Sequence, residues 1–303
     1  MTFSLLAREP ATGALGVASQ SHYLGVGAVV TWAEAGVGVV ATQAIPDRAY
    51  GPRGLALMRQ GNSAAEALSL LLDADPHREL RQVAYLDSSG CLGIHSGNRC
   101  VATADVAAND HAAALGNMLD SDAVLGAMLR GFEQAEGDLA HRLIAGLHSG
   151  DRAGGDIRGS QSAALLVVDG RRTDAPWEGL LHDLRVDDHA DPIGELARLV
   201  DLHDAFDKVS RVVFNPSGAI LGAQRSDAEF TAAATALAAA DSVLGPNPEA
   251  TFWSAVLHAR WGQSAEAQRL LADATRRNPR LPRFVARLAD AGILTAEDAA
   301  LLS

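Results

Sequence analysis

The sequence contains little cysteine and almost no lysine, and both shortages limit the chemistry that it can support. Cys91 and Cys100 are the only cysteines among 303 residues, which is too few for a disulfide scaffold, and their spacing is not that of paired metal ligands. We therefore expect a reducing, cytoplasmic compartment. Lys208 is the only lysine among the 25 Lys and Arg residues, so mechanisms that need a lysine in the N-terminal half are excluded.

The sequence also lacks the uncharged run of a membrane helix and an excess of positive charge. Glu34 interrupts the apolar stretch 24–42, and the alternation of Val and Gly there favours two buried strands. No basic region followed by an apolar run opens the chain, so we expect no signal peptide. The net charge of −12 and the pI of about 5.2 would repel nucleic acid and anionic membranes. We expect neither as a partner, and favour a small molecule or a protein.

Apolar residues are plentiful, at 48% of the chain, and they support a large packed core. Their periodicity predicts a first group of strands, with two helices after it, at 2–7, 14–19, 27–32, 36–42, 54–60 and 63–73. A second group of strands, helices and strands is predicted at 82–87, 91–95, 101–106, 111–115, 123–136, 139–149, 161–169 and 182–187. This order fits two packed sheets with helices outside, a four-layer αββα arrangement of the α+β class.

The last third of the chain is rich in Ala and Leu and is predicted to be helical. Asp191 and Pro192 are a favourable cap and first residue for a helix that we expect to reach about Asp207. The segment 247–279 resembles one helix-turn-helix repeat of the tetratricopeptide kind. We therefore predict a main domain at 1–208, a connecting segment at 209–225 and a helical segment at 226–303. A lone repeat buries its apolar face poorly, which favours packing on the main domain or a homodimer.

Thr2 is the most informative candidate for chemistry, because it directly follows the initiator Met1. A small second residue permits removal of Met1. One residue would then carry both a hydroxyl nucleophile and a free α-amine that can act as its general base. The strand predicted to begin at Thr2 would hold that amine in place, whereas most chain termini fray. The alternative is that Met1 is retained and Thr2 is an ordinary strand residue.

Several short segments occur in an order that is specific when taken together. They are Thr2-Phe3-Ser4, Thr12-Gly13, Gly36-Val37-Gly38, Ala41-Thr42-Gln43, Tyr50-Gly51-Pro52, Gly116-Asn117-Met118-Leu119, Ala153-Gly154-Gly155-Asp156, Arg158-Gly159, Gln161-Ser162-Ala163-Ala164 and 183–189. Across residues 2 to about 204 the chain thereby resembles the DUF1028 family, a branch of the N-terminal nucleophile (Ntn) hydrolase superfamily. The resemblance implies an αββα fold and an amidohydrolase that cleaves a small amide or N-acyl compound through Thr2. We expect no cofactor, and the resemblance supplies no substrate.

Gly116 and Asn117 are the candidates for stabilising the oxyanion of a tetrahedral intermediate. A backbone amide and a carboxamide can both donate hydrogen bonds to such a charge. The alternative is that Gly-Asn only makes the turn ahead of the next helix. Ser19 and Gln43 are weaker candidates for contacting the substrate, because they lie near predicted strand ends, where an Ntn site would lie.

The glycine-rich loop 153–162 supplies three more candidates for substrate binding, namely Asp156, Arg158 and Ser162. Its glycines allow close approach of a ligand to the backbone, and Arg158 could hold a substrate carboxylate with two parallel hydrogen bonds. Ser162 ends the loop. The alternative for Arg158 is a structural ion pair with Asp156 that holds the loop together.

Asp187, Asp188 and His189 provide oxygen and nitrogen atoms that could bind a divalent cation. They lack the fixed spacing of a known metal motif, and Asp191 beside them is explained as a helix cap, so a strand-to-helix connection is the alternative. Two further functional hypotheses therefore stay open. One is a catalytically silent member of the same fold whose C-terminal helices bind a protein, and the other is a metal-dependent hydrolase centred on this cluster.

Overall fold

The structure is a computed structural model that describes residues 2–222 and 226–302. It divides the chain into two compact units, Met1–Val200 and Asp201–Ser303. Met1, whose removal the Thr2 hypothesis requires, lies outside the described residues, as do residues 223–225 of the predicted connecting segment. In the described part of the chain, no helix combines the length and the apolar content that crossing a bilayer requires.

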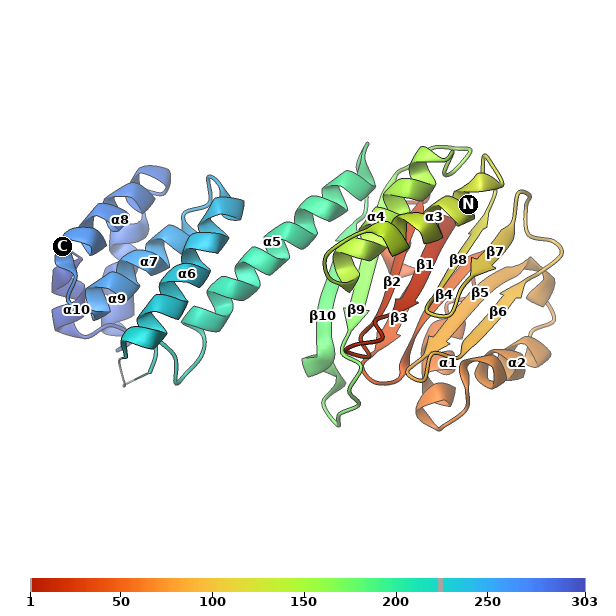
Figure 1. Ribbon diagram of the computed structural model, residues 1–303, viewed down its shortest axis with the longest axis horizontal. Helices are drawn as coiled ribbons and strands as arrows, with labels where there is room; N and C mark the ends of the chain where they lie inside the picture. Colours follow the sequence, from red (N-terminus) through yellow and green to blue (C-terminus); the bar gives the residue numbers. More distant parts are fainter. Residues whose placement is uncertain (1, 223–225, 303) are drawn as a thin grey trace. The chain divides into compact units, whose positions relative to one another are not determined.

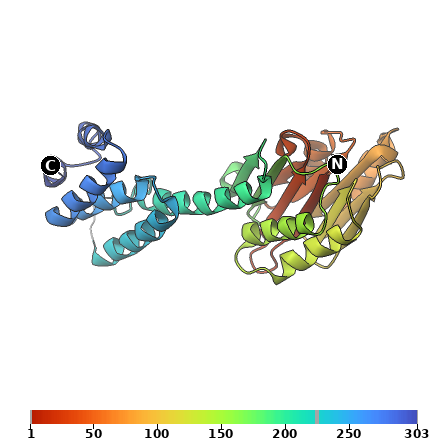
Figure 2. The same cartoon turned by 90° about the horizontal axis from the view of Figure 1, so that it is seen from above.

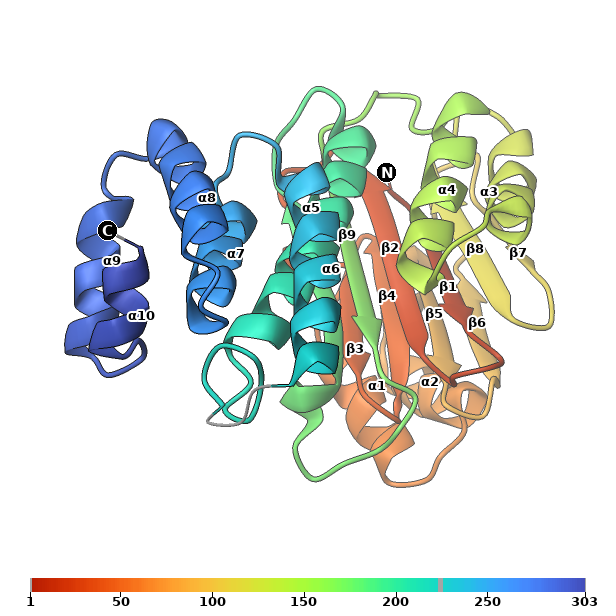
Figure 3. The ribbon, with the colours of Figure 1, turned by 60° about the vertical axis from the view of Figure 1, so that its left-hand side comes forward.

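The first sheet of the N-terminal unit has six antiparallel strands in the order β10-β9-β2-β1-β8-β7. Their bounds are β1 (Thr2–Arg8), β2 (Leu15–Ser21), β7 (Asp105–Ala108), β8 (Ala112–Asn117), β9 (Ser162–Val168) and β10 (Leu180–Val186). The hairpin predicted at 2–19 is confirmed, with Leu6 of β1 paired to Val17 of β2. The strand that begins at Thr2 is therefore an inner strand, flanked by β2 and β8 (Figure 3).

The second sheet has four antiparallel strands in the order β3-β4-β5-β6. These are β3 (Thr31–Glu34), β4 (Gly38–Ala44), β5 (Arg81–Asp87) and β6 (Leu92–Ser96). Its outer face is covered by α1 (Tyr50–Arg59) and α2 (Ala64–Ala74), and α2 begins with the predicted capping box of Ser63 and Glu66. The outer face of the first sheet is covered by α3 (Ala123–Gln134) and α4 (Leu139–Arg152) (Figures 1 and 2). The predicted four-layer αββα arrangement is confirmed.

Side chains along β1 alternate between two hydrophobic cores. Phe3, Leu5 and Ala7 pack against the helices of the outer layer. Leu6 instead packs between the two sheets, with Leu15, Val39 and others. Because side chains of a strand alternate between its faces, Thr2 and Ser4 share the face of Leu6 and point into the space between the sheets.

Two strand predictions are displaced. The strand expected at 27–32 is wrong at its start, because residues 26–28 form a 3-10 turn and β3 begins only at Thr31. The apolar side chains of this run are buried all the same, since Val26, Val29 and Val30 pack between the sheets. The apolar pattern thus indicated burial correctly, but the buried residues do not pair as a strand. The strand expected at 101–106 lies at Asp105–Ala108 as β7.

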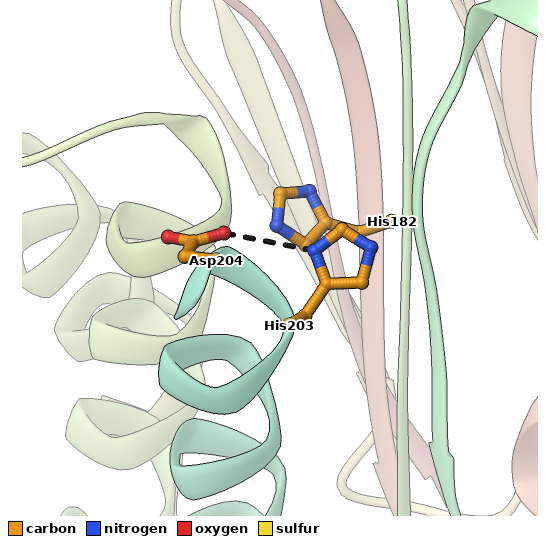
Figure 4. A group of neighbouring side chains, drawn as sticks. All are labelled: His182, His203 and Asp204. Carbon is orange, nitrogen blue, oxygen red and sulfur yellow. Dashed lines mark ion pairs between the residues drawn. The ribbon is translucent and has the colours of Figure 1, made fainter. Parts of the chain in front are cut away.

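The second unit is helical, as predicted for the last third of the chain. Helix α5 (Pro192–Val213) passes the expected end at Asp207, because Val209, Val212 and Val213 are buried in the core of this unit. On α5, His203 Nδ1 and Asp204 Oδ1 form an ion pair of 3.6 Å (Figure 4). The remaining helices are α6 (Asp227–Leu244), α7 (Glu249–Arg260), α8 (Ser264–Arg277), α9 (Leu281–Asp290) and α10 (Ala296–Leu301). The repeat-like segment 247–279 corresponds to α7 and α8.

Asp75, which follows α2, should make stability depend on pH. Burial alone would raise the pKa of this carboxyl, but hydrogen bonds from Arg81 Nε (2.9 Å), His77 N (2.8 Å) and Tyr50 Oη (3.1 Å) outweigh it and hold the pKa below its ordinary value. A lowered folded-state pKa stabilises the fold above the unfolded pKa of about 3.9, and the contribution is lost as the pH falls through the folded value.

We expect Asp75→Asn to lower the free energy of unfolding by about 1 kcal/mol at neutral pH. The difference from the wild type should shrink towards zero once acid has protonated Asp75. Urea unfolding at pH 7 and pH 3 measures both values, with Asp73→Asn on the exposed side of α2 as the control. An equal difference at both pH values would contradict the assignment.

Candidate functional site

The space between the two sheets changes from apolar to polar along its length. Most of it is filled by aliphatic side chains. At the end where β1 begins, polar side chains replace them, and each is at most 7% exposed: Thr2, Ser4, Ser19, Ser21, Gln43, Gln82 and Asn117. Buried polar groups destabilise a core unless they are hydrogen-bonded, so such a cluster marks a candidate functional site.

Thr2 lies at the edge of this polar cluster. As the first residue of β1 it is paired with Ser21 at the end of β2 and with Asn117 at the end of β8. Its Oγ1 donates a hydrogen bond to Ser21 Oγ at 3.2 Å. Its carbonyl oxygen accepts from Gln43 Nε2 at 3.1 Å and from Asn117 Nδ2 at 3.5 Å. The backbone and the hydroxyl of Thr2 are therefore both held in place.

Gln82, at the start of β5, determines how the other carboxamides are oriented. Its Nε2 is directed at the carbonyl oxygens of Gly116 (2.8 Å) and Asp105 (3.2 Å), which can only accept. Gln82 Oε1 must therefore point the other way, where it accepts from Gln43 Nε2 at 2.8 Å and from Asn117 Nδ2 at 3.0 Å. Neither neighbouring amide can be turned over without placing two acceptors against each other.

One consequence concerns Asn117, which was predicted to donate to an oxyanion. Its Nδ2 already donates to Gln82 and to the carbonyl oxygen of Thr2. Its Oδ1 is buried and has no hydrogen-bond partner among the described residues. The atom of Asn117 that remains for a further hydrogen bond is thus an acceptor. A Cβ atom at Gly116 would lie on the opposite face of β8, 2.7 Å from the side chain of Leu119, so packing there favours glycine.

Ser19 and Gln43 belong to the cluster but lie behind Thr2. Ser4 Oγ donates to Gln43 Oε1 at 2.6 Å and lies 2.7 Å from Ser19 Oγ. Since the single proton of Ser4 goes to Gln43, Ser19 is the donor of that second bond. Ser19 and Gln43 are at most 1% exposed, so in this structure they support Thr2 through hydrogen bonds and do not line a surface.

The predicted Asp156–Arg158 loop lies against the same end of the sheet. The carboxylate of Asp156 accepts from the backbone of His22 (3.1 Å) and of Arg158 (2.8 Å), and it pairs with the Arg158 guanidinium at 3.3 Å. The structural ion pair is therefore present, and the Arg158 side chain remains 38% exposed above it. Ser162 Oγ accepts from Val26 N and donates to Tyr23 O, so Ser162 holds the loop that follows β2.

The structure does not bring the predicted metal ligands together. Asp188 Oδ1 accepts from Gln161 Nε2 at 3.1 Å, and His189 Nδ1 accepts from Asp191 N at 3.0 Å. Asp191 Oδ1 in turn accepts from Gly194 N and caps α5, as predicted. Among the described residues, Asp187, Asp188 and His189 do not form a group whose ligand atoms could share one ion. These side chains make the strand-to-helix connection instead.

Three members of the cluster were missed by the sequence analysis: Ser4, Ser21 and Gln82. A signal existed for Ser4, which is two residues from Thr2 and so shares its face of the strand. Ser21 could have been found by extending the hairpin register, because it lies opposite Thr2. Gln82 had no local signal, since its role depends on packing between the two sheets.

Comparison with known proteins adds a family likeness. The model of a family of unknown function, DUF1028, matches residues 2–196. The crystal structure of protein SPO2555 from Silicibacter pomeroyi, which carries the same family model, is 31% identical in sequence and superimposes with a TM-score of 0.60. The match covers 69% of this chain and 89% of that one. No protein with a curated description matches this chain significantly.

Proposed function

The chain belongs to the DUF1028 family, and we propose that it is an amidohydrolase of the N-terminal nucleophile type that cleaves a small amide or N-acyl compound. The observation that carries the proposal is the position of Thr2. This hydroxyl-bearing residue begins an inner strand, and a buried polar cluster converges on it. The αββα arrangement, which the resemblance to Ntn hydrolases implies, supports the proposal. The site must still carry it, because one fold hosts many functions.

The reaction needs only Thr2, once Met1 is removed, and water. Oγ1 attacks the carbonyl carbon of the amide, and its proton passes to the α-amine of Thr2 directly or through a water molecule. The C–N bond then breaks, the departing amine takes that proton, and an ester forms on Oγ1. Water, deprotonated by the α-amine, hydrolyses the ester and regenerates the hydroxyl. The products are a carboxylic acid and an amine.

The polar cluster supports this chemistry by holding both functional groups of Thr2. Ser21 Oγ lies 3.2 Å from Oγ1 and fixes the position of the hydroxyl oxygen, and rotation about the C–O bond turns its proton from Ser21 to the α-amine before the attack. Asn117 Oδ1, an acceptor at the position paired with Thr2, is suited to accept a hydrogen bond from the α-amine. An α-amine ordinarily titrates at about pH 8, well below a lysine side chain, so a substantial fraction is in the base form near neutral pH. The absence of lysine from the first 207 residues is thus compatible with the mechanism.

The first test is the intact mass of the protein expressed in bacteria. We expect the wild type to lack one methionine, which would leave Thr2 as the free N-terminus. The protein would then be screened against a panel of N-acyl compounds, with amine release as the readout. Retention of Met1 would block the α-amine and contradict the proposed mechanism.

A further inference from the structure

Several large apolar side chains are exposed at the end of the first unit that holds Thr2. Five of them are more than half exposed and follow strand ends or loops at this end: Tyr23, Leu24, Ile45, Val101 and Ile157. We call them the apolar rim. Large apolar side chains left in water at one end of a unit are unfavourable there, and such a surface commonly binds a ligand.

Backbone hydrogen bonds connect the rim to the residues around Thr2. Tyr23 N donates at 3.0 Å to Ser21 Oγ, the same hydroxyl that accepts from Thr2 Oγ1. Met118, the residue after Asn117, accepts at its carbonyl from Ile157 N (3.4 Å) and donates through its N–H to Val101 O (2.9 Å). These three rim residues therefore lie on segments tied directly to the two partners of Thr2.

The second sheet contributes Ile45 to the rim, and Leu24 directly follows Tyr23 in the chain. Ile45 follows β4 two residues after Gln43, which donates to the carbonyl oxygen of Thr2. Ile45 N donates to Leu80 O, and Ile45 O accepts from Arg81 Nη1 at 2.7 Å. The backbone that carries this side chain is thus held on both sides. Because hydrogen bonds fix the segments that carry the rim, the rim is preorganised, and this lowers the entropic cost of binding a ligand.

We infer that the apolar rim binds the hydrocarbon part of the acyl group, so that the substrates are N-acyl compounds with an apolar acyl chain rather than acetyl or formyl compounds. The inference rests on the proposed function. An acyl chain on the rim would bury apolar surface on both sides and bring its carbonyl carbon to Thr2 Oγ1. A protein docked on the rim would instead cover Thr2 and block access to it. The reaction of such a substrate is the hydrolysis proposed above, in which the amide and water give a carboxylic acid and an amine.

The experiment compares acyl chains of increasing length on one leaving group, namely the acetyl, hexanoyl and decanoyl anilides. A fully buried methylene contributes about a fourfold gain in binding, and a rim that covers one side of the chain should give about half of that free energy. We expect kcat/KM to rise by at least about tenfold from acetyl to hexanoyl. Ile157→Gln should reduce this ratio, whereas Leu70→Gln, which changes an exposed leucine on α2, should not.

Ligand binding measured with the Thr2→Val variant tests the rim independently of hydrolysis. Calorimetry with N-decanoylglycinamide and N-acetylglycinamide should show tighter binding of the longer chain, and Ile157→Gln should weaken only that binding. Hydrolysis without dependence on chain length would overturn the rim assignment alone. Length-dependent binding without any hydrolysis by the wild type would support the rim and overturn the amidohydrolase. If Ile157→Gln separates a dimer into monomers and leaves chain preference unchanged, the rim is an interface between copies and the inference is wrong.

Discussion

Thr2→Val is expected to abolish amide hydrolysis and to leave the fold intact. Valine has nearly the shape of threonine but no hydroxyl, so the nucleophile is lost. Ser21 Oγ loses one donor but still accepts from Tyr23 N. Removing a catalytic nucleophile commonly costs several orders of magnitude in kcat, and we expect a loss of at least about a thousandfold.

Two further variants complete this test. Thr2→Ser keeps a hydroxyl and should keep part of the activity, because serine can also act as an N-terminal nucleophile. Thr235→Val makes the same change on the exposed face of α6 and should have full activity. The readout is amine release, with intact mass confirming that each protein has lost Met1. Wild-type rates in Thr2→Val would refute Thr2 as the nucleophile, whatever the substrate.

Gln82→Met is expected to cause the largest loss of stability, about 3 kcal/mol. Methionine fills a similar volume but neither donates nor accepts strongly. The carbonyl oxygens of Asp105 and Gly116 would lose a donor, and the amides of Gln43 and Asn117 would lose a shared acceptor. Each buried polar group left without a partner costs about 1–3 kcal/mol, and local relaxation recovers part of the sum.

Hydrogen exchange measured on peptides from β1 and β5 should report this change, because it follows local opening in a chain with two units. Protection should fall in both strands of Gln82→Met. The matched control, Gln134→Met at the exposed end of α3, should keep wild-type protection. The variant should also lose amide hydrolysis, since Asn117 would no longer be held beside Thr2. A loss of stability below about 1 kcal/mol would show that the cluster is satisfied without Gln82.

Local signals predicted most of the elements correctly, because these signals act over a few residues. The hairpin from Thr2 to Ser19 follows from two apolar runs and a turn closed by Gly13. The capping box of Ser63 and Glu66 and the cap at Asp191 follow from side chains that bond to nearby backbone. The layer order then follows, since each element must bury its apolar face.

The role of Asn117 shows what local signals could not predict. Its partnership with Thr2 needed only the register of β1 and β8, but its orientation depends on Gln82, a residue of the other sheet. A carboxamide can donate or accept, and the carbonyl oxygens of Asp105 and Gly116 fix the orientation of Gln82. This makes Asn117 Nδ2 the donor to Gln82 and leaves Oδ1 as the remaining acceptor. The strand expected at 27–32 failed for a related reason, because its apolar residues were buried without pairing.

By itself, the sequence determined that Thr2 begins a strand, that the fold has four layers and that the site contains no lysine, because these depend on residue identity and short-range pattern. Tertiary structure alone decided that Gln43 and Asn117 meet at Thr2 with Gln82 between them, and that large apolar side chains are exposed at the same end of the unit. The physical reason is that hydrogen bonds between two sheets join residues distant in the chain. Their geometry is set by packing of the whole unit, which no local segment specifies.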